Sequence, residues 1–174
     1  MNGVRTVAVF GGLALVLAVA NVAIVQKERL LADGTTMLVR LAPVDPRSLI
    51  QGDYMRLDYD IAQEANWSGG FAGAGDRSFG VGAQRDGHLV VRLDADSVAS
   101  FVRVHAPGTP LAPAEHLLRF RRRSGRIRIG TDAFYFQEGH AGRYDRARYG
   151  ELRVDGSGSS VLVGLRDESR QPLR

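Results

Sequence analysis

The chain opens with a continuous apolar run and then changes to short alternating segments. Residues Val7 to Val25 contain no charged side chain, and Asn21 is the one strongly polar position among them. An α-helix needs about 20 apolar residues to cross the hydrocarbon core of a membrane. The pattern therefore predicts one N-terminal transmembrane helix. We expect a helical extension over Lys27 to Asp33, ended by Gly34, because glycine is common just past a helix C-terminus.

Two interpretations of the apolar run remain open. Ala18-Val19-Ala20 has the small-x-small form that signal peptidase accepts, which is compatible with a cleaved secretory signal. The apolar run continues to Val25, however, whereas the apolar core of a cleaved signal is about 7–15 residues long. We therefore favour an uncleaved signal anchor. Because only six residues precede the span, the short N-terminal tail is expected to stay in the cytoplasm and the body to be exported.

Beyond the predicted anchor, the pattern is that of a β-rich domain. From Tyr54 to Ile61 the polarity alternates, with Met55, Leu57, Tyr59 and Ile61 on one face. A period of two is typical of a half-buried strand. Many short strands with turns about ten residues apart indicate an antiparallel barrel or sandwich. Further strands are expected at 37–41, 79–84, 89–93, 99–105, 115–122, 126–129, 133–137, 149–154 and 160–165.

Turn residues predict three hairpins between these strands. Their turns are Arg85-Asp86-Gly87-His88, Ser124-Gly125 and Asp155-Gly156-Ser157-Gly158. The glycine-rich stretch 62–80 cannot be a regular strand throughout, so we expect a short helix or irregular start and then a loop. A helical turn is expected within 138–148.

The sequence predicts three parts: an anchor at 1–33, a body at 34–166 and a polar tail at 167–174 that is expected to be frayed. Composition and charge then limit the possible partners and compartment. The formal net charge of +4 comes largely from arginine. A basic exported domain can lie against anionic lipid headgroups. Nucleic acid is the other usual partner of a basic chain, and the anchor argues against it. The chain has no cysteine, which removes disulfide evidence about the compartment.

One segment points to a family. Residues 42–59 have the sequence A-P-V-D-P-R-S-L-I-Q-G-D-Y-M-R-L-D-Y, which resembles the signature of the bacterial GDYXXLXY domain family. The similarity continues at 134–139, 147–154 and 161–165. The resemblance implies a membrane-anchored bacterial protein of uncharacterised activity, whose relatives often look like companions of multi-pass membrane proteins. It therefore implies a single-pass protein of the bacterial inner membrane with its C-terminal domain in the periplasm, and it brings no catalytic residues.

The signature also supplies candidate binding residues. Gly52 permits a positive φ, and Asp53 can accept backbone N–H groups at the turn. Tyr59 is expected on the apolar face, with its hydroxyl reaching a partner. Either these residues lock a corner of the barrel, which we favour, or they line a binding cleft. That cleft would be formed by Asp45, Arg47, Asp53, Tyr54 and Tyr59.

Catalytic and metal chemistry have little support in the sequence. Residues 46–53 are similar to the P-T-L-x-x-G-D segment of signal peptidases, but 41–45 contain no serine or cysteine. The single lysine, Lys27, lies beside the predicted span, and catalysis of that kind needs a nucleophile and a base within reach. We predict no catalytic residue, metal or cofactor. The four histidines lack metal-site spacing; they are His88, His105, His116 and His140.

Six arginines gather in the predicted hairpin 115–129. They form either a solvated strand face or a contact with lipid phosphate or an acidic partner. We expect a non-enzymatic accessory or interaction domain of the envelope that acts with a multi-pass membrane partner. The alternative is a small-molecule or peptide binder, or a hydrolase-like enzyme, on a signal-peptidase-like β scaffold that uses Asp45, Arg47, Asp53 and Tyr54. The six arginines of the predicted hairpin 115–129 are Arg119, Arg121, Arg122, Arg123, Arg126 and Arg128.

Overall fold

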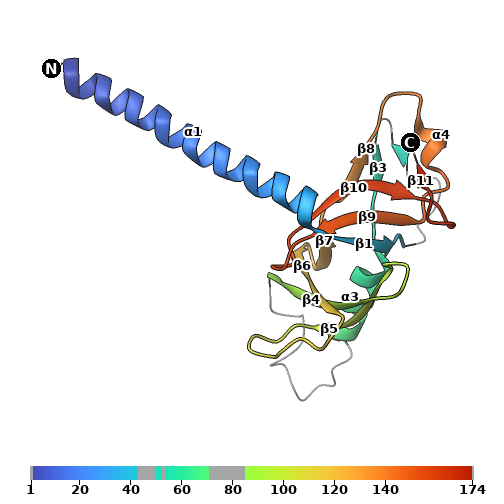
Figure 1. Ribbon diagram of the computed structural model, residues 1–174. Helices are drawn as coiled ribbons and strands as arrows, with labels where there is room; N and C mark the ends of the chain where they lie inside the picture. Colours follow the sequence, from blue (N-terminus) through green and yellow to red (C-terminus); the bar gives the residue numbers. More distant parts are fainter. Residues whose placement is uncertain (1, 43–49, 52–53, 71–84, 174) are drawn as a thin grey trace. The chain divides into compact units, whose positions relative to one another are not determined.

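The computed structural model describes residues 2–42, 50–51, 54–70 and 85–173 (Figure 1). The chain divides after Gly34 into a helical unit and a β-rich unit. The strands, sheets and pockets below all belong to the β-rich unit.

The helical unit consists of α1 (Asn2–Asp33). Its apolar stretch within Thr6–Asp33 has a mean hydropathy of 2.5, so the helix is long and apolar enough to cross a membrane. The side-chain amide of Asn21 donates to the Leu17 backbone oxygen at 2.8 Å, which satisfies the polar group inside the apolar run. The N–H of Gly34 donates to the Leu30 oxygen at 3.1 Å and ends the helix. The apolar run and its predicted extension are therefore one continuous helix.

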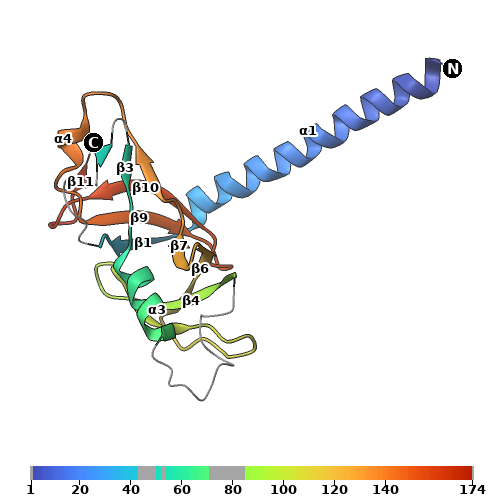
Figure 2. The ribbon, with the colours of Figure 1, turned by 180° about the vertical axis from the view of Figure 1, so that it is seen from behind.

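The β-rich unit contains two four-stranded antiparallel sheets and a smaller third sheet in its described residues (Figures 1 and 2). The first sheet has the order β1 (Thr35–Arg40), β9 (Tyr149–Val154), β10 (Ser160–Arg166), β11 (Pro172–Leu173). The second has the order β5 (Ala99–Val104), β4 (Asp86–Leu93), β6 (Glu115–Arg123), β7 (Arg126–Ile129). The third joins β2 (Ile50–Gln51), β3 (Tyr54–Arg56) and β8 (Ala133–Tyr135). Two helices complete the unit, α3 (Asp60–Gly70) and α4 (Ala141–Tyr144).

One apolar core joins the sheets. It takes side chains from β1, β3, β4, β5, β6, β7, β9, β10 and α3. Full burial of a side chain such as Phe120 stabilises the fold by about 1.5–3 kcal/mol relative to exposure. Two backbone hydrogen bonds of 2.8 Å link the large sheets, from Leu38 N–H to Ser97 and from Arg119 N–H to Gly158. The two sheets are curled half-barrels, which confirms the predicted mainly antiparallel β architecture.

The predicted strand from Tyr54 to Ile61 is wrong in its length. Met55 and Ile61 are buried, as the alternation predicts, but β3 ends at Arg56 and α3 begins at Asp60. The pairing partner β8 begins opposite Arg56, and one further backbone hydrogen bond follows, from Leu57 N–H to the Asp132 oxygen at 2.9 Å. The backbone then turns into a helix whose first N–H groups bond to the Tyr59 oxygen.

The predicted hairpin turn at Asp86-Gly87 is also wrong. Both residues lie inside β4, where they pair with Arg121 and Phe120 of β6. The segment 79–84, predicted as the other strand of that hairpin, lies outside the described residues. The other two hairpins are confirmed. Ser124 and Gly125 have φ values of 49° and 77°, which suit a two-residue turn with both residues in the left-handed region.

The described part of the predicted frayed tail, residues 167–173, contains a strand. Leu173 of β11 pairs with Leu165 of β10. A turn at Asp167 makes this return possible, because its carboxylate accepts the Gln171 N–H at 2.9 Å. The guanidinium of Arg166 also donates to the Arg170 backbone oxygen at 2.8 Å. These contacts oppose the fraying that a polar composition alone suggests.

Candidate binding site

The signature tyrosines lie in two different environments. Tyr54 of β3 pairs across the small sheet with Tyr135 of β8, and their ring centroids are 5.7 Å apart. Tyr59 is buried, with 3% of its surface exposed. The other three predicted cleft residues, Asp45, Arg47 and Asp53, lie outside the described residues. The predicted cleft therefore stays a prediction, and only its two tyrosines have a described position.

Tyr59 is fixed by its own backbone and by its burial. Its oxygen accepts the N–H groups of Ala62 at 3.0 Å and Gln63 at 3.2 Å, which starts α3. The expected partner for its hydroxyl is not found, because this atom is buried without a hydrogen bond among the described residues. Burial, with a smaller contribution from the Asp132 carboxylate, raises the pKa of the Tyr59 hydroxyl. The side chain is therefore neutral over the physiological pH range.

Asp58, at a variable position of the signature, contacts the basic hairpin. Arg128 of β7 lies 3.8 Å from the Asp58 carboxylate and 3.4 Å from that of Asp132. Its Nε atom is buried and has no hydrogen bond among the described residues. Arg128 is thus a partly buried arginine, with 23% of its side chain exposed, that is paired with two more exposed carboxylates.

The six arginines do not share one face of the hairpin. Arg121 pairs across the ladder with Arg128, and Arg123 pairs with Arg126. Arg122 points to the opposite face, because it pairs with the buried Ile127. The prediction of a single six-residue patch is wrong at Arg122, since neighbouring residues of a strand alternate between faces.

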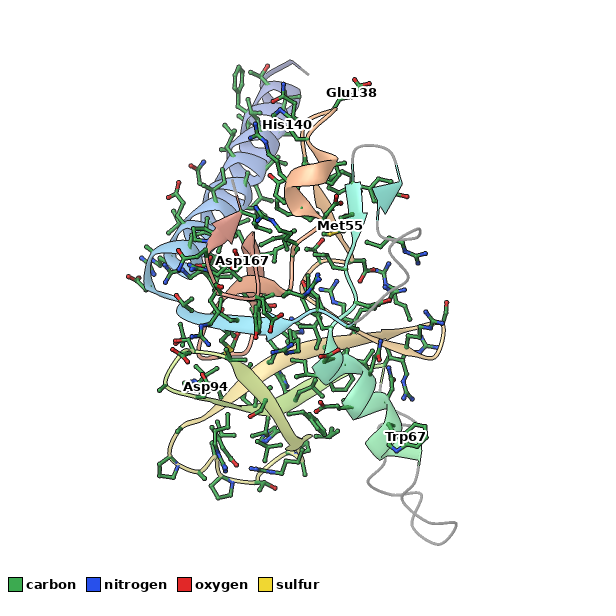
Figure 3. All side chains as sticks on the ribbon, turned by 90° about the vertical axis from the view of Figure 1, so that its right-hand side faces the viewer. Met55, Trp67, Asp94, Glu138, His140 and Asp167 are labelled. Carbon is green, nitrogen blue, oxygen red and sulfur yellow. The ribbon has the colours of Figure 1, made fainter. Side chains whose placement is uncertain are left out.

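A pocket of about 390 Å³ lies between α3 and β7. Tyr59 lies in its wall and Arg126 at its border. The Asn66 side-chain oxygen accepts the Ile127 N–H at 3.3 Å, which ties the helix to the strand edge. Figure 3 shows Trp67 at the far end of α3, and 71% of this side chain is exposed. The lining residues are Asp58, Tyr59, Ala62, Gln63, Asn66, Trp67, Arg126 and Ile127.

The chemistry of this α3–β7 pocket favours binding. Tryptophan, tyrosine and arginine are the side chains that most often dominate binding energy at protein interfaces. The described lining contains neither a serine or cysteine nucleophile nor a lysine or histidine base. A pair of that kind is therefore not present among these lining residues. Gln63, Asn66 and Trp67 were not predicted as site residues. The lone tryptophan of the chain, just after the signature, is the one sequence signal that points to them.

Comparison with known proteins identifies the signature. A family model described as GDYXXLXY protein matches residues 16–165. The chain belongs to the GDYXXLXY family. No curated protein and no solved structure matches it.

In this GDYXXLXY protein, the described signature residues divide into three roles. Met55 and Leu57 fill the core. Asp58 contacts Arg128, and Tyr59 joins the core to the pocket wall. The end of the signature in this chain, Asp58 and Tyr59, therefore lines the α3–β7 pocket.

Proposed function

We propose that this chain is a membrane-anchored binding domain of the bacterial envelope, which acts without catalysis beside a multi-pass membrane protein. In this proposal α1 holds the domain at the inner membrane and the β-rich unit is exported. The α3–β7 pocket receives a segment of the partner protein. The proposal rests on one observation: the exposed Trp67 and Arg126 line the same pocket as the buried Tyr59.

The pocket favours a particular kind of partner segment. The Trp67 indole offers a flat apolar surface, and the guanidinium of Arg126 can bind a carboxylate with two parallel hydrogen bonds. Gln63 and Asn66 line the same pocket. We therefore infer a segment with an apolar side chain next to an acidic group. Because α1 restricts the domain to a membrane surface, even a modest affinity suffices for a partner in the same membrane.

Site-specific photo-crosslinking in intact membranes tests this proposal. A photoreactive residue at Gln63, inside the pocket, is compared with one at Val163, an exposed position of β10. We expect an adduct from Gln63 that mass spectrometry identifies as a multi-pass membrane protein, and its loss in the Trp67→Ala background. An adduct formed equally from Val163, or no adduct from Gln63, would contradict the proposal.

The orientation has its own test. A phosphatase that is active only outside the cytoplasm, fused after Arg174, should be active, and its size on a gel should include α1 if the anchor is not cleaved. An inactive but stable fusion would overturn the proposed export. A fusion shortened by about two kilodaltons, the mass of some 20 residues, would show cleavage after Ala20.

A further inference from the structure

A second pocket, of about 340 Å³, lies where the β9–β10 turn meets strands β4 and β6. It shares no lining residue with the α3–β7 pocket. The turn is seated closely, because a Cβ atom on Gly158 would come within 3.1 Å of both Arg119 N and His88 Cδ2. We call this cavity the His88–Arg119 pocket. Its lining residues are Asp86, Gly87, His88, His105, Pro107, Arg119, Ser157 and Ser159.

The serine side of this pocket is held rigidly. One carboxylate oxygen of Asp155 accepts the N–H of Ser157 at 2.8 Å and that of Ser159 at 3.0 Å. The same oxygen accepts the Ser157 hydroxyl proton at 2.6 Å. The two serine hydroxyls are 3.1 Å apart, so Ser159 donates to Ser157. Both hydroxyl protons are therefore used within the turn.

The opposite side carries cationic and proton-donating groups. The rings of His88 and His105 are nearly perpendicular, with centroids 6.4 Å apart. The backbone N–H of His105 donates to the His88 oxygen at 2.9 Å, which fixes the two residues relative to each other. Nδ1 of His105 is buried and has no hydrogen bond among the described residues. Arg119 stands directly opposite His88 in the β4–β6 ladder.

The charge of the pocket depends on its two histidines. Asp86 lines the same space and is opposite Arg121 in the ladder, while the carboxylate of Asp155 is occupied by the turn. With neutral imidazoles, the charges of Arg119 and Asp86 balance. Two protonated imidazoles bring the lining to a net charge of +2. A metal ion is the weaker alternative, because the described residues contain no group of three or more suitable acidic, histidine or cysteine ligands.

We infer that the His88–Arg119 pocket binds a phosphate-class oxyanion. Charged donors make strong, short hydrogen bonds to such groups, and a pocket of this size holds the anion together with part of an attached molecule. The Arg119 guanidinium and the two imidazole rings are the side-chain donors that the lining offers to such an anion. Both a soluble phosphate compound and a lipid headgroup supply this chemistry.

Sulfate is the probe, because it is a compact oxyanion with the tetrahedral geometry of phosphate. The full chain in non-ionic detergent, with labelled histidines, is titrated with sulfate at constant ionic strength and followed by NMR. We expect saturable shifts of the His88 and His105 signals, assigned with His88→Gln and His105→Gln variants. An absence of saturable shifts would overturn the inference.

Two neighbouring arginines provide a matched comparison. Arg119→Gln removes the guanidinium that lines the pocket, and Arg121→Gln removes one on the same strand and face outside its lining. We expect sulfate affinity to fall about ten-fold in the first variant and less than about two-fold in the second. Equal losses would show diffuse attraction to a basic surface and would refute a defined site.

Nanodiscs distinguish the two sources of the anion. The chain is reconstituted in phosphatidylcholine, with or without phosphatidylglycerol, and titrated with sulfate as before. Competition by phosphatidylglycerol that depends on Arg119 would support a lipid headgroup in the pocket. Unchanged sulfate binding would support a soluble phosphate compound.

Discussion

The ring of Tyr59 lies against the backbone of Gly150, so closely that a Cβ atom added to the glycine would come within 3.0 Å of Tyr59 Cε1. Tyr59 ends the family signature, whereas Gly150 belongs to β9. The same Cβ atom would lie 3.3 Å from Cδ1 of Leu162. This packing joins the signature to a strand about 90 residues further along the chain.

Gly150→Ala should therefore destabilise the fold. Overpacking a closely packed core costs about 1–3 kcal/mol, and we expect a loss of that size in the free energy of unfolding. Urea denaturation of the full chain in mild detergent, followed by circular dichroism, measures it. Gly164→Ala in β10 is the matched control, because a Cβ atom there would meet nothing within 4 Å. Equal losses in the two variants would contradict the close packing of Tyr59 on Gly150.

Tyr59→Phe should leave stability at neutral pH unchanged or raise it by up to about 1 kcal/mol. The substitution removes a buried hydroxyl that has no hydrogen bond among the described residues, and such a group costs free energy on burial. The same denaturation experiment at pH 7 measures the change. A loss above about 1 kcal/mol would show that the hydroxyl is bonded after all.

The same hydroxyl makes stability depend on alkaline pH. Its pKa in the folded protein is raised above the ordinary value of 10.0 by burial and by Asp132. A raised pKa means that the folded state keeps this proton to a higher pH than the unfolded state does. The contribution of the hydroxyl to the free energy of unfolding is therefore complete below pH 10.0 and is lost as the pH rises further. We expect unfolding midpoints to fall less between pH 9 and 11 in Tyr59→Phe than in the unchanged chain. Equal decreases of the unfolding midpoint in the two proteins would exclude ionisation of Tyr59 as the cause.

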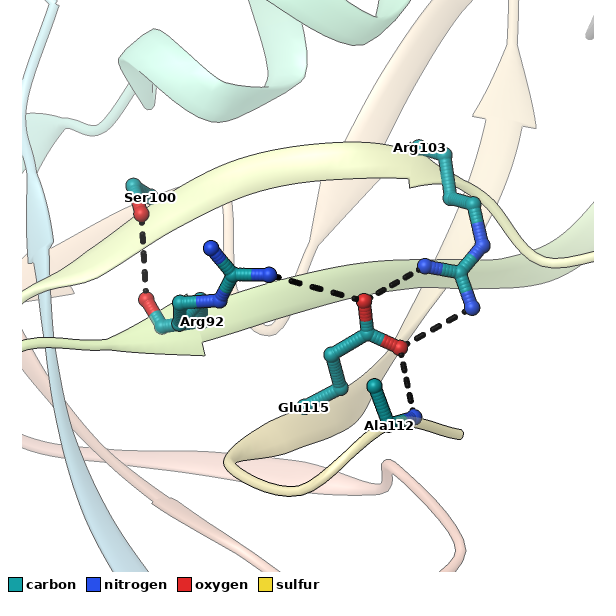
Figure 4. Close-up of polar contacts among 5 residues, drawn as sticks. All are labelled: Arg92, Ser100, Arg103, Ala112 and Glu115. Atoms are coloured by element: carbon teal, nitrogen blue, oxygen red, sulfur yellow. Dashed lines mark hydrogen bonds and ion pairs between the residues drawn. The ribbon is translucent and has the colours of Figure 1, made fainter. Parts of the chain in front are cut away.

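The carboxylate of Glu115 should govern stability in acid. Figure 4 shows Arg103 donating to both of its oxygens, at 2.6 and 2.9 Å, and the Ala112 N–H donating at 3.0 Å. The side chain is only 4% exposed. The hydrogen bond from Arg103, and then that from Ala112, lowers the pKa of Glu115 to about 2. The contribution of Glu115 to the free energy of unfolding is therefore present above its ordinary pKa of 4.5 and is lost as the pH falls toward 2.

Glu115→Gln should therefore lower the unfolding midpoint at pH 7 and flatten its decline between pH 4.5 and 2. Thermal unfolding across this range measures both effects. The control is Glu168→Gln, because Glu168 is 65% exposed and its nearest guanidinium nitrogens are 3.7 and 3.8 Å away. Exposed pairs of this kind contribute little, so the control should change neither quantity. Acid profiles of the same shape in all three proteins would rule out Glu115 as the source.

Trp67→Ala should weaken partner binding without affecting the fold. The indole is exposed, so we expect a stability change within about 0.5 kcal/mol. Retention of the membrane partner during detergent purification should fall. Tyr135→Ala is the matched control, because 75% of its surface is exposed and it lies in the separate small sheet. A similar loss of partner in both variants would show that exposed aromatic surface alone is responsible.

Sequence alternation predicted which signature side chains are buried, but not where the strand ends. Met55 and Ile61 are buried as predicted, because a strand and the first turn of a helix can present the same side chains to one core. The end of β3 depends instead on the extent of β8, which is distant in sequence. The order of polar and apolar residues within a strand does not contain that information.

The candidate pocket was only partly predictable for the same reason. Tyr59 and Arg126 were both chosen from sequence, the first from the signature and the second from the arginine-rich hairpin. Nothing local indicates that they line one pocket, since this depends on α3 packing against β7. The error at Arg122 has a simpler origin, because counting arginines ignored the alternation of the strand.

The pairing of β1 with β9 has a consequence for the order of events during synthesis. Thr35 is directly opposite Val154, so the first strand to be made has no ladder partner until well over a hundred further residues have been added. Contacts this distant in sequence form late, because a long loop must close before they contribute. The sheet that contains β1 is therefore completed only after β9 has been made, whereas the sheet of β5, β4, β6 and β7 needs only residues 86–129.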